Sequence, residues 1–279
     1  MIWKHEDRPK STIQCTSGKT IQIITAKNKP DLGKTTAPIF ADLLGPCARP
    51  WEIPPGDEIK SPVIALSSAP GLMPIFDELI GYYLEGWLSF EKIWAVSLAE
   101  LEGMSEKDPL GFRHRLVWGL LYPVDFPASN LLWPETASNS LEEAATALSK
   151  SFSEIGDKLD LALIEVEPGG RVGLNEPGTA WEPGWITTGL SQELRTSLAA
   201  KSGGNDSSVP SRGMTAGIGL LSGARNVLVA CTGSDGGNVL RQALLDEPGV
   251  HMPLSFLQEA QGECIIIMDQ EAANQLHRA

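Results

Sequence analysis

Three carboxylates bracket one short segment near the middle of the chain, residues 167–177. Glu165 and Glu167 lie at its start and Glu176 near its end. Paired carboxylates perform general acid and base catalysis when burial separates their pKa values. A solvated acidic loop is the alternative in a protein whose formal net charge is -13. The segment also contains Arg171, which is either a surface arginine or a planar cation suited to a carboxylate or phosphate.

Two other segments have the composition of anion-binding turns. The run Thr232-Gly233-Ser234-Asp235-Gly236-Gly237 follows an apolar stretch and precedes an expected helix, where backbone N–H groups and the helix dipole favour an anion. Asp235 opposes this interpretation, because its carboxylate repels a phosphate unless it points away. The segment Ser67–Gly71 offers hydroxyls and backbone donors at another expected helix start. Ordinary turns and helix caps share these compositions, so both interpretations stay open.

The elements that must position these segments alternate between two types. Runs rich in β-branched residues predict strands, and amphipathic stretches between them predict helices. Such alternation predicts a Rossmann-like, doubly wound, mostly parallel α/β sheet with helices on both faces, and it places ligand chemistry at the carboxyl ends of the strands. The predicted strands are 21–25, 63–66, 92–96, 161–164, 215–218, 227–231 and 264–268, and the predicted helices are 36–44, 73–85, 108–121, 141–155 and 238–245.

Length and composition indicate a single domain over residues 1–279. With 279 residues and 42% hydrophobic content, the chain is long enough to bury one large core. Residues 1–20 are interpreted as an N-terminal extension and the Pro-rich residues 49–60 as a surface loop. The Gly- and Ser-rich residues 201–210 are a second loop, either a lid or a spacer.

Charge and cysteine usage exclude several function classes. A net charge of -13 without any basic run argues against nucleic acid as a partner. The opening is charged and the longest apolar runs have strand length, so neither a signal peptide nor a membrane span is expected, and the cytoplasm is the expected location. Four scattered cysteines favour buried free thiols. We therefore expect no metal and no other cofactor.

Several segments, taken in order, resemble one known enzyme family. The stretch E-P-G-G-R-V-G-L-N-E-P at 167–177 resembles the active-site loop G-x-G-x-D-G-H-I-A-F-N-E-P of glucosamine-6-phosphate deaminases. The chain is similar to the glucosamine-6-phosphate deaminase and 6-phosphogluconolactonase family from about Thr25 onward, and is closer to the deaminase branch. Further matching segments are 87–90, 124–130, 215–219 and 251–258.

The resemblance also implies that most of the family's chemistry is missing. Aligned on Asn175-Glu176-Pro177, the family's acid falls on Gly169 and its histidine on Arg171, and neither residue shuttles protons near neutral pH. The carboxylate that takes the C2 proton falls on Ala99, with Glu100 beside it. A phosphate-binding lysine falls on Gly236, and a phosphate-binding arginine falls near Ala200, where Lys201 or Arg195 is a substitute.

These departures predict a family member that has lost deaminase activity and binds an anionic sugar phosphate or sugar acid. The alternatives are a diverged isomerase or lactonase that uses Glu176, Glu100 or Glu167, and a structural subunit that pairs with a paralogue or forms a homo-oligomer. Glu176 and Glu100 are the catalytic candidates. The candidate ligand-binding residues are Ser67, Ser68, Gly71, Gly170, Arg171, Asn175, Lys201, Thr232, Gly233, Ser234 and Gly236.

Overall fold

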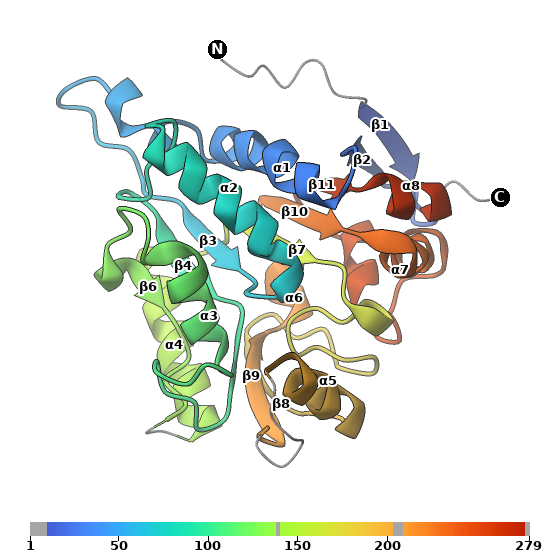
Figure 1. The fold of residues 1–279 in the computed structure, drawn as a ribbon. Helices are drawn as coiled ribbons and strands as arrows, with labels where there is room; N and C mark the ends of the chain where they lie inside the picture. The colour runs from blue at the N-terminus through green and yellow to red at the C-terminus, as the bar shows by residue number, and fades with distance from the viewer. Residues whose placement is uncertain (1–9, 138–139, 203–208, 277–279) are drawn as a thin grey trace.

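The main sheet is eight-stranded and almost entirely parallel. The computed structural model describes residues 10–137, 140–202 and 209–276 (Figure 1). The strands follow the order β1-β2-β11-β10-β7-β3-β4-β6, and only β1 is antiparallel to its neighbour. This topology confirms the predicted doubly wound α/β fold. The strands are β1 (Lys10–Gln14), β2 (Thr20–Thr25), β3 (Val63–Leu66), β4 (Trp94–Ser97), β6 (Leu131–Leu132), β7 (Leu161–Glu165), β10 (Asn226–Cys231) and β11 (Glu263–Met268).

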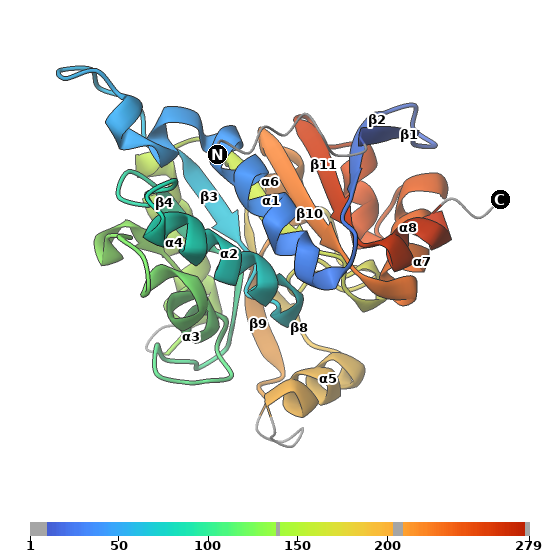
Figure 2. The ribbon, with the colours of Figure 1, turned by 45° about the horizontal axis from the view of Figure 1, so that its top comes forward.

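Helices cover both faces of this sheet (Figure 2). One face carries α1 (Lys29–Leu44), α2 (Met73–Leu84) and α3 (Phe112–Leu116), which continues as a wider π-helical turn at Val117–Leu121. The other face carries α4 (Leu141–Ile155), α6 (Ile218–Ser222), α7 (Gly233–Leu245) and α8 (Gln270–Leu276). Strand residues alternate between the two cores because successive side chains point to opposite faces. Short 3₁₀ turns occupy Gly45–Ala48, Pro50–Glu52, Pro70–Leu72, Ala128–Asn130, Pro168–Gly170 and Pro253–Gln258.

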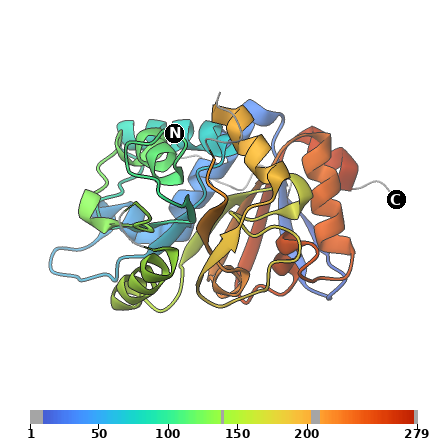
Figure 3. The same ribbon diagram turned by 90° about the horizontal axis from the view of Figure 1, so that it is seen from below.

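A second, three-stranded antiparallel sheet lies beyond the carboxyl ends of the main strands. Its order is β5 (Ala99–Leu101), β9 (Arg212–Ala216) and β8 (Trp185–Gly189), and α5 (Gln192–Ser202) packs beside it, as Figure 3 shows from below. The prediction of a main-sheet strand at 215–218 was wrong. Its first half belongs to β9, and α6 begins at Ile218.

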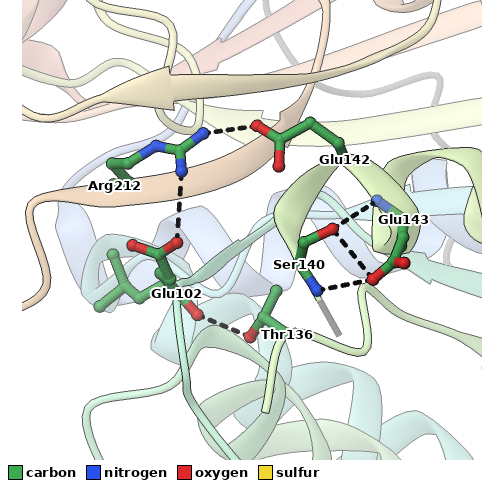
Figure 4. Close-up of polar contacts among 7 residues, drawn as sticks. Glu102, Thr136, Ser140, Glu142, Glu143 and Arg212 are labelled. Atoms are coloured by element: carbon green, nitrogen blue, oxygen red, sulfur yellow. Dashed lines mark hydrogen bonds and ion pairs between the residues drawn. The ribbon is translucent and has the colours of Figure 1, made fainter. Parts of the chain in front are cut away.

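One arginine ties the second sheet to α4 (Figure 4). Arg212 on β9 lies 2.6 Å from the carboxylate of Glu142 and 3.5 Å from that of Glu102. Thr136 donates a 2.7 Å hydrogen bond from its hydroxyl to the carbonyl of Leu101, the last residue of β5. Ser140 and Glu143 close a reciprocal cap at the start of α4. The Arg212 and Thr136 contacts connect the second sheet to the start of α4 and to the segment before it.

Element boundaries were predicted well in some places and poorly in others. The predicted bounds of β3 and α4 are confirmed. α1 begins at Lys29 rather than residue 36, because Asn28 caps it by accepting from the N–H of Asp31. The Gly-rich run 232–237 was predicted as a turn, but α7 already begins at Gly233. Gly237 lies against Ala272 of α8, where a side chain has no room, so this glycine serves helix packing and not a turn.

The assigned extension and loops are only partly described. Residues 10–14 of the extension form β1 at the edge of the main sheet. The excursion at 49–60 contains the short turn Pro50–Glu52, and Trp51 in it is 55% exposed. Residues 1–9 and 203–208 lie outside the described part of the chain.

All four cysteines are buried free thiols, as predicted. Burial raises the pKa of Cys15 to about 11 and also raises the pKa of Cys231. Within the described residues, no helix has the length and apolar character to cross a membrane.

The glycines of α7 and α2 provide a matched test of the packing. We expect Gly237→Ala to lower the free energy of unfolding by about 1–3 kcal/mol, because the new methyl group collides with α8. We expect Gly81→Ala in α2 to raise it by about 0.5–1 kcal/mol, since nothing lies within 4 Å of the added carbon. Urea unfolding measures both. Equal changes in the two variants would contradict the close contact of α7 with α8.

Candidate functional site

The chain reverses its winding direction between β3 and β7. These strands are adjacent and parallel. α2 follows β3 and packs on one face, whereas the chain after β7 leads to α6 on the other face. Such a switch point opens a crevice beyond the carboxyl ends of the two strands, where ligands of doubly wound folds bind. The loops 67–71 and 167–176 follow these strands.

A cavity of about 10 Å³, enough for one water molecule, lies at this crevice. Four elements surround it. The loop after β3 contributes Ala69 and Pro70, the loop after β7 contributes Glu167, Arg171 and Gly173, α3 contributes Phe112 and Arg115, and α5 contributes Leu194 and Leu198. The cavity therefore combines two guanidinium groups and one carboxylate with apolar walls.

Arg171 is the buried cation of the loop after β7. It is 8% exposed and forms an ion pair with Glu167, which is also buried. Its Nε atom is buried without a hydrogen-bond partner. Burial lowers the pKa of Arg171, and the charges of Glu176 and Glu165 oppose that shift. An arginine stays protonated despite such a shift, so the loop carries a permanent, incompletely satisfied cation.

The backbone of this loop is held in place by its polar and glycine residues. Gly169 and Gly170 both adopt a φ of 69°, in the left-handed region. Gly170 also lies directly against Met252, so a side chain there has no room. Asn175 is fully buried and donates from Nδ2 to the carbonyls of Val172 (2.9 Å) and Ala216 (2.8 Å). Asn175 and Gly170 thus shape the loop from within.

The loop after β3 is closed against the loop after β7. The N–H of Ser67 donates to the carbonyl of Leu163, and its hydroxyl lies 3.3 Å from the N–H of Ala69. The Ser68 hydroxyl is buried and has no partner. The carboxylate of Glu165 lies directly against Gly71, in the space that a side chain at that position would fill. A negative charge therefore already occupies this face of the loop.

Arg115 is a site residue that the sequence interpretation missed. Its guanidinium lies 4.7 Å from the centre of the Phe112 ring, and Nη1 donates to the carbonyl of Leu110 at 3.2 Å. Its Nε is buried without a partner. Burial lowers the pKa of Arg115, and the charge of Glu100 opposes the shift. The only sequence signal was an arginine within the predicted helix 108–121.

Glu100 supports α3 rather than lining the cavity. Its carboxylate is 1% exposed and accepts from the backbone N–H groups of Leu101 (2.9 Å), Phe112 (3.0 Å) and Arg113 (2.8 Å). Ala99, the preceding residue of β5, faces the other way and lies beside Gly173. This is the alternation expected of a strand.

Glu176 also binds backbone at a helix start. It accepts from the N–H of Ser191 at 2.9 Å and from the Ser191 hydroxyl at 2.5 Å. Ser191 precedes α5 and its hydroxyl accepts in turn from the N–H of Leu194. Glu176 therefore anchors α5 and does not line the cavity. Lys201 falls within α5, but its side chain lies outside the described part of the structure.

The third predicted anion loop lies at a different groove. Thr232 and Gly233 line an open groove of about 450 Å³ together with Lys27, Lys29 and Asp269. The N–H of Gly233 donates to the carboxylate of Asp269 at 3.1 Å. Ser234 is exposed on the first turn of α7. All three loops lie at the same edge of the sheet, as predicted, but only the first two share the cavity.

Gly236 lies within α7 rather than in a loop. A side chain there begins 3.3 Å from the Cys231 sulfur, tighter than an ordinary contact. Among the described residues, no group of three His, Cys, Asp or Glu side chains has the geometry to hold a metal ion.

Known proteins resemble this chain over nearly its whole length, although no family model matches it. A glucosamine-6-phosphate deaminase of Clostridium perfringens strain SM101 is 26% identical over 258 residues, which cover 92% of this chain and 100% of that protein. The corresponding enzyme of Shouchella clausii is 27% identical over 217 residues, covering 77% and 87%.

Solved structures of similar fold include a glucosamine-6-phosphate deaminase and a 6-phosphogluconolactonase. A monomeric glucosamine-6-phosphate deaminase superimposes with a TM-score of 0.80 at 23% identity and covers 91% of this chain and 99% of that one. A 6-phosphogluconolactonase of Thermotoga maritima gives a TM-score of 0.67 at 17% identity, covering 89% and 99%. The fold around the cavity is therefore shared with enzymes that act on sugar derivatives.

The pKa of Glu100 predicts a pH dependence of stability. Burial raises this pKa above the ordinary value of 4.5, although three backbone donors oppose the shift. The folded protein then binds the proton more tightly than the unfolded chain, so the stability that Glu100 contributes is present below pH 4.5 and lost as the pH rises through the folded pKa. Glu100→Gln does not ionise. We therefore compare the unfolding free energy of wild type with that of this variant. We expect the difference, wild type minus variant, to decrease as the pH is raised from 4.5 to 8.

Urea unfolding at the two pH values measures this difference. Glu143→Gln, at the exposed cap of α4, is the control for changing a carboxylate that accepts backbone hydrogen bonds. A wild-type advantage over Glu100→Gln that grows with pH would contradict the raised pKa.

Proposed function

Because this chain belongs to the glucosamine-6-phosphate deaminase and 6-phosphogluconolactonase family of carbohydrate metabolism, we propose that it is a catalytically impaired, cytoplasmic binder of an anionic sugar, either a sugar phosphate or a sugar acid. The binding site is the crevice between β3 and β7. The observation that carries this proposal is the buried Arg171, whose Nε has no partner at the edge of a cavity. Buried polar groups without partners are rare in folded proteins, and they cluster where a ligand or water completes the site.

The impairment rests on three positions of the aligned active-site segments. Ala99, Gly169 and Arg171 stand where the resemblance implies an aspartate, an acid and a histidine. General acid and base groups each contribute about 10²–10⁴ in rate, so their joint loss is incompatible with efficient deamination.

The two surviving carboxylates are committed to other contacts. Glu100 accepts three backbone N–H groups and faces away from Gly173, whereas its neighbour Ala99 faces the loop. Glu176 is bonded to Ser191. A one-residue shift of β5 that brought Glu100 to the loop would turn the whole strand over and break its pairing with β9.

A diverged lactonase is the second candidate, and one observation favours it. Glu167 lies in the cavity beside Arg171, so a carboxylate and a cation that polarises a carbonyl are already adjacent. The ion pair also engages the Glu167 carboxylate, which would have to leave Arg171 to activate water. We therefore rank binding above catalysis. The structural-subunit alternative would be favoured if no sugar derivative binds.

Glucosamine 6-phosphate provides the first functional test. We expect no release of ammonia or fructose 6-phosphate above background, and we expect Arg171→His to remain inactive because the groups at Ala99 and Gly169 stay absent. Coupled assays for both products measure this, with an active deaminase relative as the positive control. Turnover of about 1–10³ per second in the wild-type protein would reject the proposal. Activity that appears only in Arg171→His would reveal an unrecognised base.

Anion binding by Arg171 provides the second test. A thermal-shift screen across phosphosugars and sugar acids identifies a ligand, since binding stabilises the folded state by RT ln(1 + [L]/Kd). We expect Arg171→Ala to weaken binding of that ligand by about 1.5–3 kcal/mol, the value of a hydrogen bond to a charged group. Arg225→Ala is the matched control, because Arg225 lies beside Asp160, outside the cavity. Equal affinity of wild type and Arg171→Ala would exclude this arginine from the site.

A further inference from the structure

We infer that Arg115 and Arg171 together form the binding pocket for a carboxylate group, and that Glu167 occupies this pocket until the ligand's carboxylate displaces it. The inference rests on the proposed function, and it narrows the ligand to a sugar acid rather than a sugar phosphate. It also assigns a binding role to Arg115, which occupies no position of the family motifs quoted for this chain.

Two arginines from different parts of the fold meet at one small cavity. Arg171 comes from the loop after β7 and Arg115 from α3, and both line the same space. In each side chain the Nε atom is buried and has no hydrogen-bond partner. The Ser68 hydroxyl, next to the cavity-lining Ala69, is a third buried group without a partner. Buried donors without partners on two arginines that line one cavity indicate that an acceptor completes the site.

The two guanidinium groups are held in fixed orientations. Arg115 stacks on Phe112 and donates from Nη1 to Leu110, which leaves its Nε edge uncommitted. Arg171 contacts Glu167 through Nη2, so its Nε is likewise uncommitted. Each guanidinium presents a fork of donors that matches the two oxygens of a carboxylate. The two arginine side chains therefore lose little conformational freedom when the anion binds.

The surrounding charges favour a singly charged group over a doubly charged phosphate. The two arginines are accompanied by Glu167 inside the cavity, by Glu165 and Glu176, whose charges act on Arg171, and by Glu100, whose charge acts on Arg115. Glu165 also lies against Gly71, in the segment Ser67–Gly71 that has the composition of an anion-binding turn. A second negative charge on the group held between the two arginines would add repulsion from these carboxylates without adding a cation.

Glu167 already performs the role of the ligand's anionic group. Its carboxylate contacts the same guanidinium that an incoming carboxylate would contact. The space left beside Glu167, about 10 Å³, holds one water molecule and does not admit a second carboxylate. Ligand binding therefore exchanges one carboxylate for another on Arg171, while Arg115 contributes a contact that Glu167 does not use. The affinity depends on this exchange, which makes Glu167 a competing internal ligand.

Four probes and three variants test this arrangement by titration calorimetry. The probes are gluconate, glucose 6-phosphate, 6-phosphogluconate and glucose, which separate the carboxylate from the phosphate. We expect wild type to bind gluconate and 6-phosphogluconate more tightly than glucose 6-phosphate or glucose. Arg115→Met should weaken gluconate binding by about tenfold or more, because a hydrogen bond to a charged group is lost. Glu167→Gln should strengthen it by about three- to tenfold, because a neutral amide holds the arginine less tightly.

Arg113→Met is the matched control for loss of a nearby positive charge. The Arg113 guanidinium lies over the Trp133 ring and pairs with Glu106, outside the cavity. The gluconate affinity of the Arg113→Met variant should equal that of wild type. Urea unfolding verifies that each variant is folded. If Arg115→Met proves unfolded, Glu167→Gln alone decides the exchange, and unchanged or weaker gluconate binding in it overturns the inference.

The outcomes separate this inference from the proposed function. Preferential binding of glucose 6-phosphate would overturn the carboxylate pocket and leave the sugar-phosphate binder intact. Equal gluconate affinity in wild type and in a folded Arg115→Met variant would overturn the role of Arg115 alone. Failure of wild type to bind any of the four probes would reject the pocket together with the proposed function.

Discussion

The buried charge of Arg171 is the constraint on which the arrangement of the site depends. A guanidinium that is 8% exposed has lost most of its contact with water, and leaving it without a counter-ion would cost several kcal/mol. Glu167 lies four residues earlier, on the other side of the turn at Pro168–Gly170, and supplies that counter-ion. The turn requires two glycines with a φ of 69°, so the ion pair and the backbone conformation depend on each other.

The carboxylates around the crevice are all engaged in contacts within the protein. Glu167 forms an ion pair with Arg171. Glu100 accepts hydrogen bonds at the start of α3, and Glu176 accepts them from Ser191 before α5. These helices in turn supply the other walls of the cavity. Glu100 and Glu176 therefore position the cation pocket from outside, whereas Glu167 lies within it beside Arg171. This arrangement favours binding over turnover.

Sequence reasoning predicted the elements whose signals are local and missed those that depend on long-range packing. β3 and α4 were predicted with their observed bounds, because an uninterrupted apolar run and a capped amphipathic stretch define them. The second sheet was missed, because β5 has three residues and finds its partner β9 more than a hundred positions away. Its residues carry no alternating pattern long enough to distinguish a separate sheet from the main one.

The site was predictable only where a motif carried it. Arg171 was found because it occupies a position in a recognisable loop. Arg115 was missed because its significance arises from how α3 docks near the switch point, which only the three-dimensional arrangement reveals. The placement of Gly233 and Gly236 in a turn was wrong for a related reason. In a sequence, a run of glycines predicts a turn. In α7, Gly237 instead allows the close approach of α8.

Packing around the glycines opposes single substitutions that introduce a side chain at these positions. A side chain at Gly170 meets Met252, one at Gly71 meets Glu165, and one at Gly236 begins 3.3 Å from the Cys231 sulfur. Gly169 has a φ of 69°, so an acid there adopts a strained backbone. At Gly71, Gly170 and Gly236 a neighbouring group therefore occupies the space that a side chain would need. The glycines allow the loop after β7 to pack against the loop after β3. This packing leaves the narrow cavity in which Arg115 and Arg171 remain charged.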